Sequence, residues 1–170
     1  MFIDTRRLKN FPPIVNQSCR ILILGSMPSK VSLQKRQYYG HPQNHFWKII
    51  GHLLRHKEWA DYATKRKTLL ENNIALWDVV DSCWRESSLD VDLREVKGSD
   101  LKTFIKKYPN IKAVFCNGTT AFSLFRRNYG DIDLPVVRLP STSPAHTISF
   151  GKKLQKWRRI MMVLKEQQTI

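Results

Sequence analysis

Apolar runs alternate with amphipathic stretches along the chain. Buried parallel strands are expected at CRILILG (19–25), IALWDVV (74–80), IKAVFCNG (111–118) and LPVVRLP (134–140). Helical spacing predicts helices over 44–56, 58–73, 100–110, 119–130 and 152–168, the third opened by Asp100 as its cap. This alternation predicts an α/β fold: a three-layer αβα domain around a central four-stranded, mainly parallel sheet.

Long polar segments leave the carboxyl ends of three of these strands, at 25–43, 80–99 and 141–151. Ligands of parallel sheets bind beyond the carboxyl ends of the strands, so all three segments are expected to line one rim. We interpret 25–43 as a functional loop, because it is far longer than a turn and rich in Tyr and His. We expect 80–99 to be irregular, and residues 1–170 to form a single domain.

The charge balance indicates the kind of partner. Lys and Arg number 29 against 14 Asp and Glu, a formal net charge of +15. Folding does not require such an excess, because like charges repel one another in the compact state. Nucleic acid is therefore expected as the partner ahead of an anionic membrane, with an evenly solvated basic surface as the alternative.

Cysteine usage and the N-terminal sequence bear on location. Cys19, Cys83 and Cys116 are scattered and form no metal-site spacing, which favours reduced thiols in a cytosol. The N-terminal residues contain no apolar core of signal-peptide length, and no run approaches a membrane span. We expect a cytoplasmic, nucleoid-associated protein with no membrane partner, no metal and no other cofactor.

The rim lacks several common catalytic motifs. The sequence has no phosphate-binding P-loop, no G-x-G-x-x-G, no H-E-x-x-H and no G-x-S-x-G. Amides, hydroxyls, a few His and one carboxylate, Asp78, remain at the strand ends. Such groups, together with aromatic side chains, suit recognition of a planar heterocycle better than phosphoryl transfer.

Three ordered motifs carry a resemblance to a known family. They are GSMPS (25–29), YYGHPQNHFW (38–47) and PSTSPAH (140–146), with ALWDVVDSC (75–83) and FCNGTTAF (115–122) in the expected order between them. Together they resemble the uracil-DNA glycosylase superfamily, and within it the hypoxanthine-DNA (deoxyinosine) glycosylase branch. The resemblance covers nearly the whole chain. It implies a monomeric DNA repair enzyme that flips out a deaminated base, chiefly hypoxanthine, and excises it hydrolytically.

The chain departs from better-known members of this family at two positions. Met27 stands where the uracil enzymes have a water-orienting Asp and the mismatch-specific enzymes an Asn, and Ser141 stands where the uracil enzymes have a catalytic His. In the branch that lacks both residues, the amide of the HPxN segment is required. The resemblance therefore implies that Asn44 is catalytic. It also implies that the reaction leaves an abasic site and passes through no covalent enzyme intermediate. The alternative role of Asn44 is a helix N-cap.

The resemblance also implies a base-binding set. The base would lie against the loop formed by Gly25, Ser26, Met27 and Pro28. The backbone N–H groups of this loop would stabilise the departing base, in the manner of an oxyanion hole. Tyr39 would stack on the base, or else only pack the loop. Asp78 would accept a hydrogen bond from N1–H of hypoxanthine, or else brace the loop that follows it.

DNA contacts are expected from hydroxyls and cations around the last motif. In the family this loop enters the minor groove. The expected DNA-binding residues are Ser29, Ser141, Thr142, Ser143, Pro144, Ala145, His146, Lys152 and Lys153. The alternative for the lysines is a solvated helix face.

Rival functions follow from the same residues. One keeps the fold and changes the substrate to uracil or to G·U and G·T mismatches. Another is a DNA-binding module without catalysis, since both standard catalytic residues are replaced. A nucleosidase acting on free inosine is a weaker alternative, because a small neutral substrate does not need the +15 charge.

Overall fold

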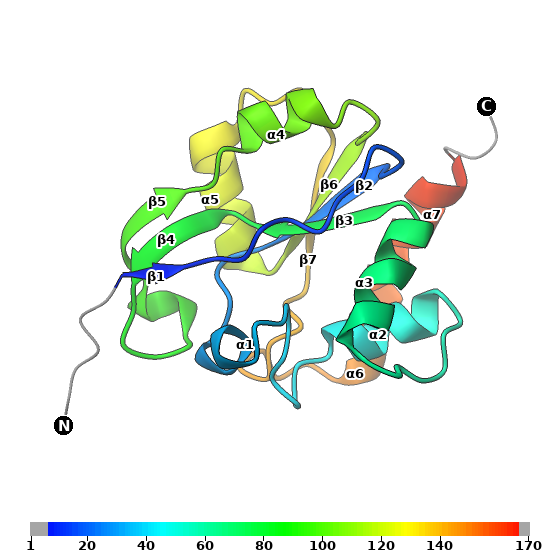
Figure 1. Ribbon diagram of the computed structural model, residues 1–170, viewed down its shortest axis with the longest axis horizontal. Coiled ribbons are helices and arrows are strands. Elements are labelled where there is room, and N and C mark those ends of the chain that lie inside the picture. Colours follow the sequence, from blue (N-terminus) through cyan, green and yellow to red (C-terminus); the bar gives the residue numbers. More distant parts are fainter. Residues whose placement is uncertain (1–6, 167–170) are drawn as a thin grey trace.

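The computed structural model describes residues 7–166 and contains the expected central sheet. Its strands are β2 (Ile21–Gly25), β3 (Ile74–Asp78), β6 (Ala113–Asn117) and β7 (Val136–Leu139), in the order β3-β2-β6-β7. All three strand pairs are parallel. The αβα prediction is confirmed (Figure 1).

Helices cover both faces of this sheet because successive residues of a strand point to opposite sides. Ile21 and Ile23 pack against α2 (Phe46–Leu53), α3 (Tyr62–Glu71), α6 (Phe150–Trp157) and α7 (Arg159–Glu166). Leu22 and Leu24 pack against α4 (Leu101–Lys107) and α5 (Thr119–Tyr129). Figure 1 shows the two groups of helices on opposite sides of the sheet.

A second, three-stranded sheet occupies the region expected to be irregular. Its antiparallel strands are β1 (Leu8–Lys9), β4 (Val80–Trp84) and β5 (Arg94–Gly98), in the order β1-β4-β5, with a short 3₁₀ turn at Asp90–Asp92 before β5. The expectation of irregular structure over 80–99 was wrong. Strand β5 reads REVKG, is almost wholly exposed and pairs across register shifts, so no alternating pattern marks it in the sequence.

The long segment 25–43 also contains structure that the sequence analysis missed. Helix α1 (Lys30–Lys35) begins at Ser29, whose hydroxyl oxygen accepts from the Ser32 N–H at 3.1 Å. Ser29 is thus the N-cap of α1, a role that the sequence analysis did not assign to it; its expected contact with DNA stays a prediction. Asp100 caps α4 as expected, accepting from Thr103 N–H at 3.2 Å.

The last expected helix, 152–168, is in fact two helices. Helices α6 and α7 are separated by a break at Arg158. Residues 167 and 168 lie outside the described residues. No helix within 7–166 is long and apolar enough to cross a membrane.

Candidate active site

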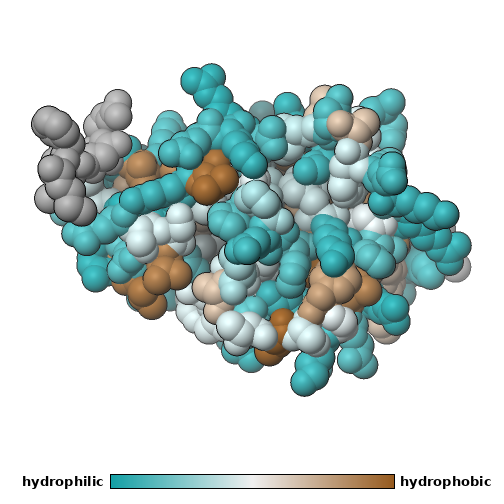
Figure 2. Space-filling view, turned by 90° about the horizontal axis from the view of Figure 1, so that it is seen from below, coloured by the Kyte–Doolittle hydropathy of each residue, from teal (hydrophilic) through white to brown (hydrophobic). Residues whose placement is uncertain are grey.

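The carboxyl ends of the parallel strands bring the three polar segments together at one edge. Ser26 after β2 donates its hydroxyl to Asp90 at 2.6 Å, and the Lys30 N–H donates to Ser88 at 3.0 Å. His45 N–H donates to the Thr142 carbonyl at 3.0 Å, which joins the first segment to the last. Figure 2 views the molecule from this side and shows a mainly hydrophilic surface with small, separate hydrophobic patches. The expected rim is therefore present.

Three residues of the expected base-binding set meet at the end of β2. Gly25 pairs in register with Asp78 on β3. A Cβ atom on Gly25 would lie only 2.5 Å from Asp78 Oδ1 and 2.8 Å from the Tyr39 hydroxyl. The absence of a side chain at position 25 therefore allows the carboxyl and the phenol to approach the same point.

Tyr39 is held by packing on one face. Its ring stacks on Phe46 of α2, with centroids 4.1 Å apart and planes inclined by 20°. Its backbone has a φ of 53°, a left-handed conformation that costs an ordinary residue about 1–3 kcal/mol. The surrounding structure must offset that cost, so the orientation of Tyr39 is imposed by the fold and is not a local preference.

Asp78 is an uncompensated buried carboxyl. It is 3% exposed, and Oδ2 has no hydrogen-bond partner among the described residues. Burial, reinforced by the charge of Asp90 and opposed by Arg85, raises its pKa to about 7. The Tyr39 hydroxyl is likewise buried and makes no hydrogen bond of ordinary geometry with the described residues. Burial raises the pKa of Tyr39, and the nearby Asn117 side chain opposes that shift only in part. Unpaired buried polar groups are costly, so this pair of orphaned groups points to a ligand that supplies the missing partners.

The loop after β2 is held in place by hydrogen bonds that its backbone carbonyls accept from residues after β3. Val79 N–H donates to the Gly25 carbonyl at 2.9 Å, and Val80 N–H to the Ser26 carbonyl at 3.0 Å. Met27 and Pro28 are buried, and the Met27 side chain belongs to the core beside α5. The N–H groups of Ser26 and Met27 donate no hydrogen bond to any acceptor within residues 7–166, which leaves both donors for a ligand.

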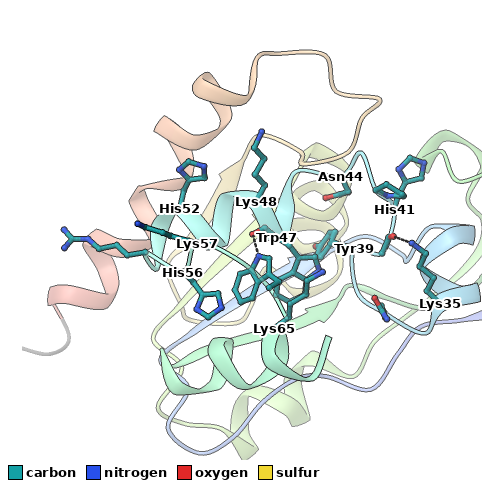
Figure 3. A pocket seen from close by; sticks show the side chains of 16 residues that line it. Lys35, Tyr39, His41, Asn44, Trp47, Lys48, His52, His56, Lys57 and Lys65 are labelled. Carbon is teal, nitrogen blue, oxygen red and sulfur yellow. Dashed lines mark hydrogen bonds between the residues drawn. The ribbon is translucent and has the colours of Figure 1, made fainter. Parts of the chain in front are cut away.

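Asn44 lies where the loop enters α2. Its side-chain Oδ1 accepts from the Phe46 N–H at 2.9 Å, so the amide oxygen does serve the start of the helix. The amide NH₂ has no protein partner among the described residues, and Oδ1 retains a second lone pair. Asn44 also lies near Tyr39 and His41 at one end of a surface groove (Figure 3). The N-cap of α2 is His45, which makes no side-chain capping hydrogen bond, so Asn44 closes a turn just before the helix and is not its N-cap. That turn is compatible with a second role of Asn44 at the rim.

In the loop after β7, Thr142 is buried, although it was expected to contact DNA. Thr142 is 1% exposed, and its N–H donates to Asn117 Oδ1 while its hydroxyl accepts from Asn117 Nδ2, both at 2.9 Å. Thr142 is thus a buried anchor, which corrects its assignment as a DNA contact. Ser141 and Ser143 accept from N–H groups within the loop. Pro144, Ala145 and His146 form its exposed tip.

The two lysines at the start of α6 have different environments. Lys152 is exposed, as a phosphate contact requires. Lys153 is fully buried, and its ammonium donates to the Ser143 carbonyl at 3.2 Å. Burial lowers the pKa of Lys153. Lys153 therefore holds the loop from inside, which corrects its expected place on the DNA-facing surface.

Sequence reasoning missed two residues at the rim. Asn117 ends β6 and anchors the last loop, and its place at a strand end before Gly118 was the only available signal. Arg85 is buried beside the first loop, where it donates to the Pro28 carbonyl. Its Nε and one terminal nitrogen have no partner among the described residues. No pattern marked Arg85, because the surrounding segment was expected to be irregular.

We expect Gly25→Ala to abolish whatever activity the rim supports. The added methyl group cannot coexist with Asp78 Oδ1 at 2.5 Å, so the carboxyl and Tyr39 must both move. Overpacking of this kind costs about 1–3 kcal/mol of folding free energy, measurable by urea denaturation. Gly151→Ala is the matched control. A Cβ there meets nothing within 4 Å, so we expect unchanged activity and a slight gain in stability. Full activity of Gly25→Ala would contradict this view of the rim.

Comparison with known proteins finds one matching family model and two relatives that share one name. A family model described as the uracil DNA glycosylase superfamily matches residues 12–165, which include all three rim segments. A Methanosarcina barkeri protein named hypoxanthine DNA glycosylase is 36% identical over 111 residues, 65% of this chain and 70% of that protein. A Methanosarcina acetivorans protein of the same name is 37% identical over 114 residues, 66% of this chain and 72% of that protein.

A solved structure extends the similarity to the fold. It is the solution NMR structure of a candidate uracil DNA glycosylase from Methanosarcina acetivorans, with a TM-score of 0.82 and 30% sequence identity. The similarity covers 94% of this chain and 99% of that one. The fold is thus shared with that structure over nearly the whole of both chains.

Proposed function

Since the chain belongs to the uracil-DNA glycosylase superfamily, we propose that it is a DNA repair glycosylase that excises deaminated bases, hypoxanthine above all. The observation that carries this proposal is the buried, unpaired carboxyl of Asp78 beside Tyr39. The names of the two Methanosarcina relatives support the same substrate. The protein acts as a monomer on DNA in the cytoplasm, associated with the nucleoid.

Base recognition uses groups that lack partners in the free protein. Hypoxanthine carries an N1–H donor, which the ionised Asp78 carboxyl accepts. Tyr39, which lines the groove, stacks on the base with the ring face opposite Phe46, an interaction that contributes about 1–3 kcal/mol. The target nucleotide must leave the helix to reach this site. The exposed Ile148, in the loop that enters the minor groove, is suited to fill the space left in the stack.

Bond cleavage relies on electrostatics and positioning. The C1′–N9 bond breaks with its electron pair on the base, so negative charge develops on the base and positive charge on the sugar. The free N–H groups of Ser26 and Met27 stabilise the base, and the DNA phosphates stabilise the sugar. Asn44 positions the water that attacks C1′, whose proton passes to the departing base or to solvent. Neither Met27 nor Ser141 supplies the side chain used by the uracil enzymes.

The proposal is tested by single-turnover base release from otherwise identical duplexes that contain deoxyinosine, deoxyuridine, or a G·U or G·T mismatch. We expect hypoxanthine to be released fastest. Faster release of uracil or of mismatched bases would instead assign the protein to the rival specificity. Binding to every duplex without any base release would assign it to the non-catalytic rival.

A further inference from the structure

A surface groove runs from the candidate active site along α2 to the start of α3. Its volume is about 710 Å³, and it is shared by the 35–44 loop, α2, the 55–59 segment and Lys65 of α3. Figure 3 shows Tyr39, His41 and Asn44 toward one end, with His52, His56 and Lys57 toward the other. None of the base-excision steps described above uses the far end.

Positive charge converges on this groove without neutralisation. The cationic side chains that line it are Lys35, Lys48, Arg55, Lys57 and Lys65, and no Asp or Glu lines it. None of the five forms an ion pair with any residue in 7–166. Burial, reinforced by the nearby charge of Lys35, lowers the pKa of Lys65. Like charges held together in a concavity favour an anionic ligand, because the concave wall concentrates their field.

Aromatic rings lie among these cations. His56 stacks on Trp59, with centroids 4.4 Å apart and planes inclined by 29°. Trp59 donates its indole N–H to the Trp47 carbonyl at 3.0 Å, which fixes the stacked pair against α2. Cations that follow a backbone, together with aromatic faces that accept bases, are the features of single-strand nucleic-acid sites. The groove has the volume of a small-ligand pocket, enough for a few nucleotides of one strand and too little for a duplex.

We propose that this groove binds the single strand that continues from the flipped nucleotide, with phosphates on the lysines and a base on the His56–Trp59 pair. The inference rests on the proposed function for the position of the flipped nucleotide. It goes beyond that function because it predicts that unpaired DNA next to the lesion binds more tightly than fully paired DNA.

The test compares two double variants of equal charge. Lys57→Gln/Lys65→Gln removes two groove cations, neither of which has a role in base release. Lys106→Gln/Arg127→Gln removes two cations from α4 and α5, which Figure 1 shows on the other side of the sheet. Fluorescence anisotropy gives the affinity for a single-stranded oligonucleotide with one deoxyinosine and for the blunt duplex of the same sequence, over a range of salt concentrations.

We expect the groove variant to bind the single strand about tenfold more weakly, and its log–log salt slope to fall by about 1.4, since each lost phosphate contact accounts for about 0.7. Duplex binding should change no more than in the control. Equal losses for single strand and duplex, or a loss no greater than the control's, would overturn the proposal. The readout is binding, so it remains decisive even if the wild type releases no base, a result that would refute only the proposed function.

Discussion

Asp78→Asn is expected to raise the free energy of unfolding at about pH 8 by up to about 4 kcal/mol, since about 1.4 kcal/mol corresponds to each pKa unit. Burial raises the pKa of Asp78 from 3.8 to about 7. Between these pH values the folded state retains a proton that the unfolded state has lost. The stability contributed by Asp78 is therefore complete below about pH 4 and is lost as the pH rises to about 7. The Asn variant has no such loss.

Urea denaturation of the wild type and Asp78→Asn across this pH range measures the difference in their free energies of unfolding. It should be small near pH 4, grow up to about pH 7 and remain constant above it. Asp100→Asn is the matched control, because hydrogen bonds from Thr103 lower the pKa of Asp100 and Asn preserves the cap. The difference in free energy of unfolding between Asp100→Asn and the wild type should therefore change only as the pH falls and Asp100 becomes protonated. A pH-independent difference for Asp78→Asn would contradict a buried, uncompensated carboxyl.

The same substitution should impair catalysis while it stabilises the fold. Release of hypoxanthine by the wild type should increase through about pH 7, as Asp78 ionises and becomes the acceptor for N1–H. Asp78→Asn should be slower at high pH, with a profile that is flat in this range, and its preference should shift toward uracil. If Asp78 only braced the following loop, the variant would lose stability and retain the wild-type specificity. No hydrogen bond from residues 7–166 to this carboxyl supports such a brace.

Asn44→Ala is expected to reduce the single-turnover rate of base release on the order of 10²–10³-fold, the effect of removing one transition-state hydrogen bond. It also removes the hydrogen bond to the Phe46 N–H and should cost about 1 kcal/mol of folding free energy. Affinity for the damaged duplex should be close to that of the wild type, because the phosphate contacts remain.

Asn44→Ser separates the two roles of this side chain. A serine hydroxyl can accept from the Phe46 N–H, so stability should return to nearly the wild-type value. The hydroxyl does not replace the amide NH₂, so base release should remain as low as in Asn44→Ala. Recovery of both stability and base release in Asn44→Ser would show that the residue acts only at the start of α2.

The central sheet could be predicted from the sequence because β2, β3 and β6 are buried on both faces, whereas β7 at the edge is only partly buried. ILILG and AVFCN are uninterrupted apolar runs, and the residues that follow them necessarily lie at one edge. Gly25, Asp78 and Tyr39 could be placed together for the same reason, with the motif order supplying Tyr39. Asp100 was recognisable as a cap from local chemistry alone.

The failures arise where long-range packing determines the role of a polar residue. Strand β5 is exposed on both faces, so only its pairing with β4 defines it. Thr142 and Lys153 resemble DNA contacts in sequence, yet both are bound inside the protein. Asn117, 25 residues away, holds Thr142, and the Ser143 carbonyl, 10 residues away, holds Lys153. Sequence spacing cannot distinguish a buried lysine from an exposed one when a single helix carries both, as with Lys152 and Lys153.

The most direct test of the account is release of free hypoxanthine from a duplex with one deoxyinosine, measured under single-turnover conditions. The wild type, Asn44→Ala and Asn44→Ser are compared at matched binding saturation. We expect release by the wild type and almost none by either variant, although all three bind the duplex. A wild type that binds the duplex and releases no base would contradict it.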